Sequence, residues 1–169
     1  MKKKYVDLLQ EVFGDIELKS LKIIHDRPIV FVCGGPVDIK ASPPPSVRNR
    51  FIDYCARTDP HLESSLIQAE VFKEYLANSL YPDLLTFEDD IAQVSSLIVI
   101  FLESPGSINE LGLFCNYKNI NNKLIIFAPS KDVQYKDSFI WLGPLTYLKN
   151  NDDTSVHVYP WPLPGVQHY

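Results

Sequence analysis

Cysteine and long apolar runs are both scarce in this 169-residue sequence. The three cysteines, Cys33, Cys55 and Cys115, are odd in number and far apart, with no CxxC pair and no histidine at a zinc-binding spacing. No apolar stretch follows the N-terminal lysines, and the longest apolar run, Leu97 to Leu102, is far too short to span a membrane. We therefore predict a cytoplasmic protein with reduced thiols, no secretory signal, no metal, no cofactor and no membrane contact.

Clustered positive charge is missing as well. The 16 Lys and Arg residues are outnumbered by 21 Asp and Glu residues, the net charge is −5, and the one basic run, Lys2 to Lys4, lies at a terminus. Sequence-independent binding of nucleic acid needs clustered Lys and Arg, so the excess of acidic residues disfavours it. The apolar fraction of 46% and the charged fraction of 22% are typical of a globular protein, long enough here for one domain.

Apolar runs and helical periodicity alternate along the chain. Continuous apolar runs predict strands buried on both faces at 28–33, 97–102 and 123–127, and shorter strands at 65–69 and 156–159. Helical spacing predicts helices at 4–13, 46–57, 71–80, 86–95 and 107–117, with a further one at 137–149 that is interrupted at Gly143-Pro144. A single long helix also fits the pattern over 65–80.

Two of these helices begin with capping signals. Ser46 is expected to cap the helix at 46–57, which would bury Val47, Phe51 and Tyr54. Thr86-x-x-Asp89 resembles a capping box for the helix at 86–95.

Buried strands that alternate with helices predict a flavodoxin-like (Rossmann-like) α/β fold. We expect a three-layer, doubly wound sheet of about five parallel strands in the order 2-1-3-4-5, with right-handed crossovers. This domain would occupy residues 28–159, after an N-terminal helix and lead-in at 1–27 and before a proline-rich tail at 160–169. Ligands bind such sheets beyond the carboxyl ends of the strands, where the strand order switches between the first and third.

Both strand ends at this switch point carry unusual turns, and the first is Cys33-Gly34-Gly35. Glycines directly after a buried strand let a ligand approach the backbone closely, so we predict substrate contacts here. A plain tight turn explains the same residues equally well. The absence of GxGxxG argues against a dinucleotide fingerprint.

The second turn, Glu103 to Ser107, opens a helix. Gly106 and Ser107 at a helix entrance would attract phosphate or another anion, while Glu103 and Ser104 at the strand end would contact the ligand. Ser107-x-x-Glu110 also fits a capping box, in which Glu110 returns to the Ser107 amide. A Glu110 carboxylate above the cleft is, alternatively, well placed to attack a sugar carbon.

Three acids, Glu88, Asp89 and Asp90, gather near the start of another predicted helix. The helix dipole favours acids at such a position whatever their function. We retain Glu88 as the functional candidate of the three.

The residues just discussed lie in segments that resemble nucleoside 2-deoxyribosyltransferases. The resemblance rests on Phe87 to Val94, on Leu97 to Leu102 and on the ESPGSINELGLF segment that starts at Glu103. More closely, the sequence resembles the deoxyribosyltransferase-like domain of bacterial retron effectors, the toxic arm of an anti-phage system. Val30 to Gly35 and Ser138 to Pro144 extend this likeness, which spans roughly residues 28 to 148.

The resemblance implies cleavage of an N-glycosidic bond. Glu110 stands where the transferases carry the nucleophile, as in retaining glycoside hydrolysis, and Glu88 stands where they place an Asp that assists the departing base. Two positions depart from the pattern, because Phe31 replaces a Tyr and Ser104 an Asp. These departures favour a nucleotide or NAD-like substrate over a free nucleoside.

Partners are also implied only by the resemblance. Retron effectors associate with a reverse transcriptase and its RNA-linked single-stranded DNA, and the transferases form homo-oligomers through the helix that bears the nucleophile. Such effectors usually continue into a winged-helix DNA-binding domain, so this chain is either a shorter relative or one served by a separate DNA-binding chain. A non-catalytic nucleotide sensor and a scaffold subunit of a retron complex stay open as alternatives.

Overall fold

The structure is a computed structural model that describes residue 14 and residues 27–72, 81–130 and 137–160. The helices predicted at 4–13 and over most of 71–80, and nearly all of the tail, lie outside the described residues. The centre of the fold is a five-stranded parallel sheet in the order β2-β1-β3-β4-β5, which confirms the predicted flavodoxin-like arrangement. The strands are β1 (Val30–Cys33), β2 (Leu66–Ile67), β3 (Leu97–Phe101), β4 (Leu124–Pro129) and β5 (Val156–Tyr159).

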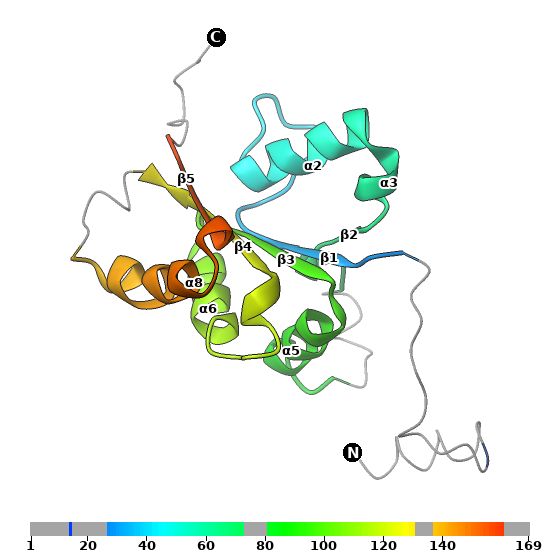
Figure 1. Ribbon diagram of the computed structural model, residues 1–169. Helices are drawn as coiled ribbons and strands as arrows, with labels where there is room; N and C mark the ends of the chain where they lie inside the picture. The colour runs from blue at the N-terminus through cyan, green and yellow to red at the C-terminus, as the bar shows by residue number, and fades with distance from the viewer. Residues whose placement is uncertain (1–13, 15–26, 73–80, 131–136, 161–169) are drawn as a thin grey trace.

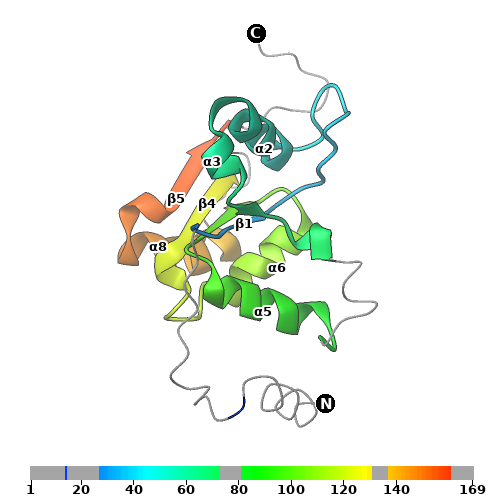
Figure 2. The same ribbon diagram turned by 90° about the vertical axis from the view of Figure 1, so that its right-hand side faces the viewer.

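Helices cover both faces of the sheet, so the domain has three layers (Figures 1 and 2). The first crossover helix α2 (Val47–Thr58) and the short α3 (Pro60–Glu63) lie on one face. The helices α5 (Leu84–Val94), α6 (Pro105–Phe114) and α8 (Thr146–Asn151) lie on the other. Among the described residues, no helix combines the length and apolar character needed to cross a membrane.

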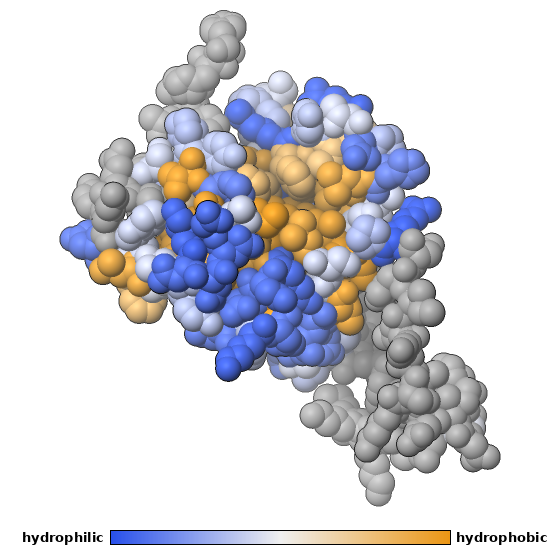
Figure 3. All heavy atoms as spheres, in the orientation of Figure 1, coloured by the Kyte–Doolittle hydropathy of each residue, from blue (hydrophilic) through white to orange (hydrophobic). Residues whose placement is uncertain are grey.

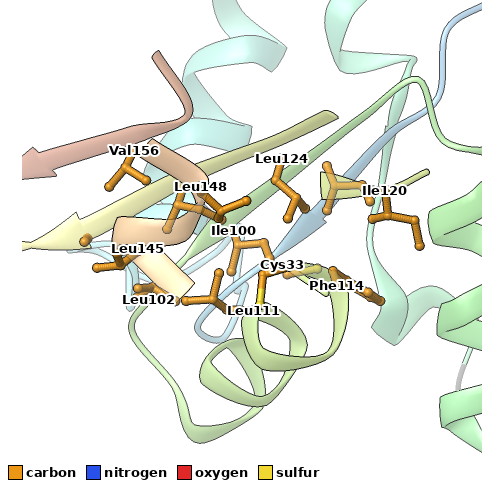
Figure 4. Packing of buried hydrophobic residues seen from close by; sticks show 14 of the residues in the cluster. Cys33, Ile100, Leu102, Leu111, Phe114, Ile120, Leu124, Leu145, Leu148 and Val156 are labelled. Atoms are coloured by element: carbon orange, nitrogen blue, oxygen red, sulfur yellow. The ribbon is translucent and has the colours of Figure 1, made fainter. Parts of the chain in front are cut away.

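Alternation along β1 divides the core into two clusters. Val30 and Val32 face α2, whereas Phe31 and Cys33 face α6, because successive side chains of a strand point to opposite faces. The larger cluster joins β1, β3 and β4 to the buried faces of α5, α6 and α8 (Figure 4). Figure 3 shows apolar residues gathered on the surface where α2 and α3 meet the sheet, over the smaller cluster.

The start of α2 confirms one capping prediction. Ser46 is its N-cap and accepts a hydrogen bond from the Asn49 amide. The expected buried face is only partly right, because Tyr54 is 63% exposed while the polar Arg48 and Asn49 are buried. The polar Asn49 side chain is tolerated in the interior because its oxygen accepts a hydrogen bond from the Asp38 amide, at 2.6 Å.

Other boundaries differ from the sequence predictions for identifiable reasons. The helix α5 begins at Leu84, because Asp83 is the N-cap and accepts the Thr86 amide at 2.8 Å, so the proposed capping box from Thr86 is wrong. The helix predicted at 137–149 is not interrupted at Gly143-Pro144. It forms a π-helical turn, Trp141–Leu145, whose Trp141 carbonyl accepts the Thr146 hydroxyl at 2.6 Å.

The region after α3 decides between two predictions. Leu66 and Ile67 form β2 and pair in parallel with Val30 and Phe31, so a single long helix over 65–80 is wrong. A 3₁₀ turn, Ala69–Phe72, follows this strand.

The two-cluster core predicts unequal costs for two phenylalanine truncations. Phe114 on α6 is fully buried, whereas Phe139 is 85% exposed. We expect Phe114→Ala to lower the free energy of unfolding by about 3–5 kcal/mol and Phe139→Ala to change it by less than about 0.5 kcal/mol. Urea denaturation measures both, and equal effects would contradict the assignment of Phe114 to the core.

Candidate active site

The carboxyl ends of β1 and β3 meet at the predicted switch point, and Glu103 joins them. Its Oε1 accepts the Gly35 amide at 3.0 Å and the Arg48 amide at 2.9 Å, and its Oε2 accepts the Val47 amide at 2.9 Å. A residue just after β3 thereby holds both the turn after β1 and the first turn of α2. Ser104 adds a further link, because its hydroxyl donates to the Gly34 carbonyl at 3.1 Å.

The need for Glu103 follows from the composition of α2. Its first turn contains no acidic residue, yet a helix N-terminus carries free amides and a partial positive charge. Glu103 supplies the missing negative charge from another strand. The sequence predicts a ligand contact for this carboxylate. In the structure its two oxygens accept hydrogen bonds from three backbone amides, so Glu103 holds the turn after β1 against the start of α2.

Close packing explains why glycine occupies positions 34 and 35 in the turn after β1. A Cβ at Gly35 would lie 2.9 Å from Ser46 Cβ and 3.0 Å from Glu103 Cδ. A Cβ at Gly34 would lie 3.0 Å from both Arg48 Cβ and Phe101 Cβ. Close contact of the turn with α2 and β3 is therefore sufficient to explain both glycines.

The helix α6 begins two residues earlier than predicted. Ser104 is the N-cap and Pro105 the first helical residue, and the capping box joins Ser104 to Ser107 rather than Ser107 to Glu110. The Ser107 hydroxyl is buried and donates to the Ser104 carbonyl at 2.9 Å, so it belongs to the cap. Gly106, in contrast, is exposed, and a Cβ there would meet only the Ser104 hydroxyl, at 3.7 Å.

This cap leaves Glu110 without a capping role. Glu110 shares one face of α6 with Ser107, Leu111 and Phe114, which follow the i, i+3, i+4, i+7 spacing of a buried stripe. Its Oε2 is buried and accepts no hydrogen bond from the described residues. Buried polar atoms are nearly always paired, so this oxygen makes Glu110 the candidate for a bond to a ligand.

Several charged groups surround Glu110. Burial first, and then the nearby Glu88 carboxylate, raise the pKa of Glu110 from 4.5 to about 7, and Glu70 adds to this increase. The polar Cys33 thiol and the charge of Arg48 act in the opposite direction and lower this pKa. Glu88 itself is buried on α5. The structure therefore brings together the two acids that the sequence singled out.

Cys33 ends β1 in register with Ile100 of β3 and is almost wholly buried. Burial and the neighbouring Glu110 raise the pKa of the Cys33 thiol well above its usual value, so the sulfur stays protonated near neutral pH. Phe31 packs edge-on against Phe114 with ring centroids 6.4 Å apart.

Arg48 is the site residue that sequence reasoning missed. Its side chain is 2% exposed and forms a two-pronged ion pair with Glu70, at 2.6 and 3.1 Å, while Nη1 also donates to the Val32 carbonyl. Its Nε is buried without a hydrogen-bond partner among the described residues. An arginine in the first turn of a helix that lacks acids was a visible signal, because the helix dipole disfavours a cation there.

The described residues contain no group of three or more His, Cys, Asp or Glu side chains placed to hold a metal ion. The chemistry available at the switch point is that of a buried and a partly buried carboxylate, a thiol and an arginine. These features define a flavodoxin-like α/β domain with a paired-carboxylate site.

Comparison with known proteins places this domain in a family. Residues 44–165 match the family model described as "STM3845 retron effector protein", which covers most of the chain. The chain belongs to this retron effector family.

Two relatives from Escherichia coli extend the comparison. The chain is 31% identical over 159 residues to the "Retron Ec86 putative ribosyltransferase/DNA-binding protein", an alignment that covers 92% of this chain and 49% of the relative. It is 34% identical over 134 residues to the "Retron Ec73 putative ribosyltransferase/DNA-binding protein", covering 78% of this chain and 41% of the relative. The chain thus spans at most about half the length of these relatives.

The three amide bonds to Glu103 predict a stability effect. In Glu103→Gln, an NH₂ group replaces one carboxylate oxygen, so at least one backbone amide loses its acceptor and the charge is lost. We expect the free energy of unfolding to fall by about 1–3 kcal/mol, measured by urea denaturation. The matched change at the exposed Glu63 should cost less than about 0.5 kcal/mol. Equal costs at the two positions would refute the structural role of Glu103.

The raised pKa of Glu110 predicts a pH-dependent stability difference. The unfolded chain releases this proton near pH 4.5 and the folded state near pH 7, so the folded state binds more protons in this window. The contribution of Glu110 to the free energy of unfolding therefore falls as pH rises through the window. The free energy of unfolding of Glu110→Gln, minus that of the native protein, should therefore increase between pH 4.5 and pH 7. We expect an increase on the order of 3 kcal/mol.

Urea denaturation at several pH values measures this difference. Cys115→Ala, a packing change in the same core cluster, serves as the control and should shift stability by the same amount at each pH. A difference for Glu110→Gln that does not vary with pH would contradict the burial of an ionisable carboxylate.

Proposed function

We propose that this chain is a nucleoside 2-deoxyribosyltransferase-like enzyme that cleaves the N-glycosidic bond of a nucleotide or NAD-like substrate, as the toxin of a retron anti-phage system. One observation carries the proposal: Glu110 is a partly buried helical carboxylate with no capping role, beside a second buried acid, with an oxygen that lacks a partner among the described residues. The printed names of both relatives include ribosyltransferase, which supports the same chemistry.

The proposed reaction assigns different roles to the two acids. Glu110 attacks the anomeric carbon of the sugar, and the bond to the base breaks as the new carbon–oxygen bond forms. Glu88 donates a proton to the departing base. Water or a second acceptor then gives a proton to Glu88, attacks the anomeric carbon of the glycosyl-enzyme and releases Glu110. Two carboxylates with different surroundings can divide the acid and nucleophile roles in this way.

Substrate recognition is proposed at the two turns of the switch point. The exposed Gly106 lies at the entrance of α6, where a phosphate is favoured by the helix N-terminus. The Arg48 Nε is a further donor in the site that lacks a partner among the described residues. A phosphate-bearing ligand therefore suits the site better than an uncharged nucleoside.

Partners are proposed from family membership. The two relatives are named as DNA-binding proteins, and the chain matches at most about half of their length. We propose that the effector acts with a retron reverse transcriptase and its RNA-linked single-stranded DNA, which restrain its activity.

Base release from a substrate panel tests the proposed reaction. We expect incubation with nucleotides, deoxynucleotides and NAD to release a free base, detected by chromatography. Glu110→Gln should lower this rate by about 10³-fold or more, because it removes the nucleophile. The exposed Glu63→Gln should leave the rate unchanged.

Two results would count against the enzyme. Release that survives Glu110→Gln at full rate would show that another group is the nucleophile. Tight retention of an intact nucleotide, with no base released by the native chain, would instead favour a nucleotide sensor.

A further inference from the structure

The carboxylate of Glu70 is fixed at the carboxyl ends of two neighbouring strands. Glu70 lies in the 3₁₀ turn Ala69–Phe72 that follows β2, and β2 pairs in parallel with β1. Its two oxygens accept hydrogen bonds from Arg48 of α2, at 2.6 and 3.1 Å. The Arg48 Nη1 also donates to the Val32 carbonyl of β1, at 3.3 Å. One guanidinium thus joins α2, the end of β1 and the turn after β2.

The burial of Arg48 at this position is costly and calls for a compensating role. Its side chain is 2% exposed, and the positive end of α2 disfavours a cation in the first turn of that helix. Replacing a buried ion pair by apolar side chains is often neutral or stabilising, so stability alone does not account for the Arg48–Glu70 pair. Holding the Glu70 carboxylate in one place beside the site does account for it.

We propose that Glu70 binds a ribose hydroxyl of the substrate and that Arg48 is the residue that positions it, so that the site prefers ribonucleotides to 2′-deoxyribonucleotides. This inference rests on the proposed function for the substrate class, a nucleotide or NAD-like molecule. It adds the identity of the sugar, which the reaction at Glu110 and Glu88 does not determine.

The place of Glu70 in the fold suits this role. In dinucleotide-binding doubly wound folds, an acidic residue downstream of the first βα turn bonds the ribose 2′-hydroxyl, and ligands bind beyond the carboxyl ends of the strands. This chain lacks the glycine fingerprint of those folds, but it has an acid after β2, next to the first strand of the sheet. The charge of Glu70 also acts on Glu110, which agrees with a position in the same site.

The exposure and chemistry of Glu70 suit it as well. Its side chain is 42% exposed, in contrast to that of Arg48, so a ligand can reach the carboxylate. Each carboxylate oxygen accepts more than one hydrogen bond, so the ion pair and a bond from a ligand hydroxyl are compatible. A ligand without that hydroxyl forfeits a hydrogen bond to a charged group, which is the source of the expected preference.

Binding of matched nucleotide pairs tests the proposal. Isothermal titration calorimetry with the Glu110→Gln chain, which prevents turnover, measures the dissociation constants of AMP, GMP, CMP and UMP and of their 2′-deoxy counterparts. We expect the ribonucleotide of highest affinity to bind about tenfold or more tightly than its deoxy counterpart. Equal affinities within each pair would overturn the proposal, whatever the variants of Glu70 do.

Substitutions at the ion pair, made in the same background, assign the preference to these residues. Glu70→Gln should weaken binding of the ribonucleotide by about fivefold or more and leave that of the deoxy counterpart within about twofold, because a neutral amide is the weaker acceptor. Arg48→Lys retains a cation but not the two-pronged geometry, so it should lower the preference in part. Circular dichroism checks that each variant is folded.

Asp53→Asn is the matched control. Asp53 also pairs with an arginine, Arg57 on α2, and its side chain is 39% exposed. This variant should leave the preference for ribose unchanged. A preference that survives Glu70→Gln in a folded chain, or that Asp53→Asn removes as well, would overturn the assignment to Glu70. Full preference in Arg48→Lys would overturn the positioning role of Arg48.

The result is separable from that of the proposed reaction. A preference for ribose that depends on Glu70, in a native chain that releases no base, would support this inference and defeat the proposed enzyme. Base release at equal rates from ribonucleotides and deoxynucleotides would defeat this inference and support the enzyme. If no nucleotide binds, both are wrong.

Discussion

The carboxylate of Glu103 is the interaction on which the switch point depends. It satisfies three backbone amides from two segments far apart in the sequence, and it offsets the positive end of α2, which has no acid in its own first turn. A Cβ at Gly34 or Gly35 would lie within 3.0 Å of carbon atoms of α2, β3 or Glu103, so glycine is favoured at both positions. The same contact places Arg48 beside the site, because its amide is one of the three donors.

The position of the α6 cap decides what Glu110 can do. A helix capped by Ser107 would put Glu110 at the third helical position, where its side chain would return to the cap amide. Ser104 takes the cap instead, Pro105 fits the first helical position, and Ser107 completes the box. Glu110 then lies nearly two turns inside the helix, on its buried stripe. A shift of three residues in the cap thus converts a structural carboxylate into a chemically available one.

The sheet could be predicted from the sequence, but the helix caps and the ion pair around the site could not. Short continuous apolar runs identify doubly buried strands, and their alternation with helices predicts the strand order and the meeting of the two turns. Helix starts were misplaced where a capping Asp83 or Ser104 precedes the apolar pattern, since several polar residues there compete for the cap. The Arg48–Glu70 pair was missed because its members lie 22 residues apart and its carboxylate comes from an irregular segment.

The charge balance around Glu110 connects the fold to the proposed chemistry. Arg48 is the cation that acts on Glu110, and its ion pair with Glu70 leaves little of its charge for the other two acids. Glu88 and Glu110 therefore share a desolvated site in which two negative charges repel, which favours one proton on the pair. Glycosidic cleavage needs one anionic carboxylate and one acid, and such a pair provides both. A base that carries positive charge, as in a NAD-like ligand, would further favour the anion at Glu110.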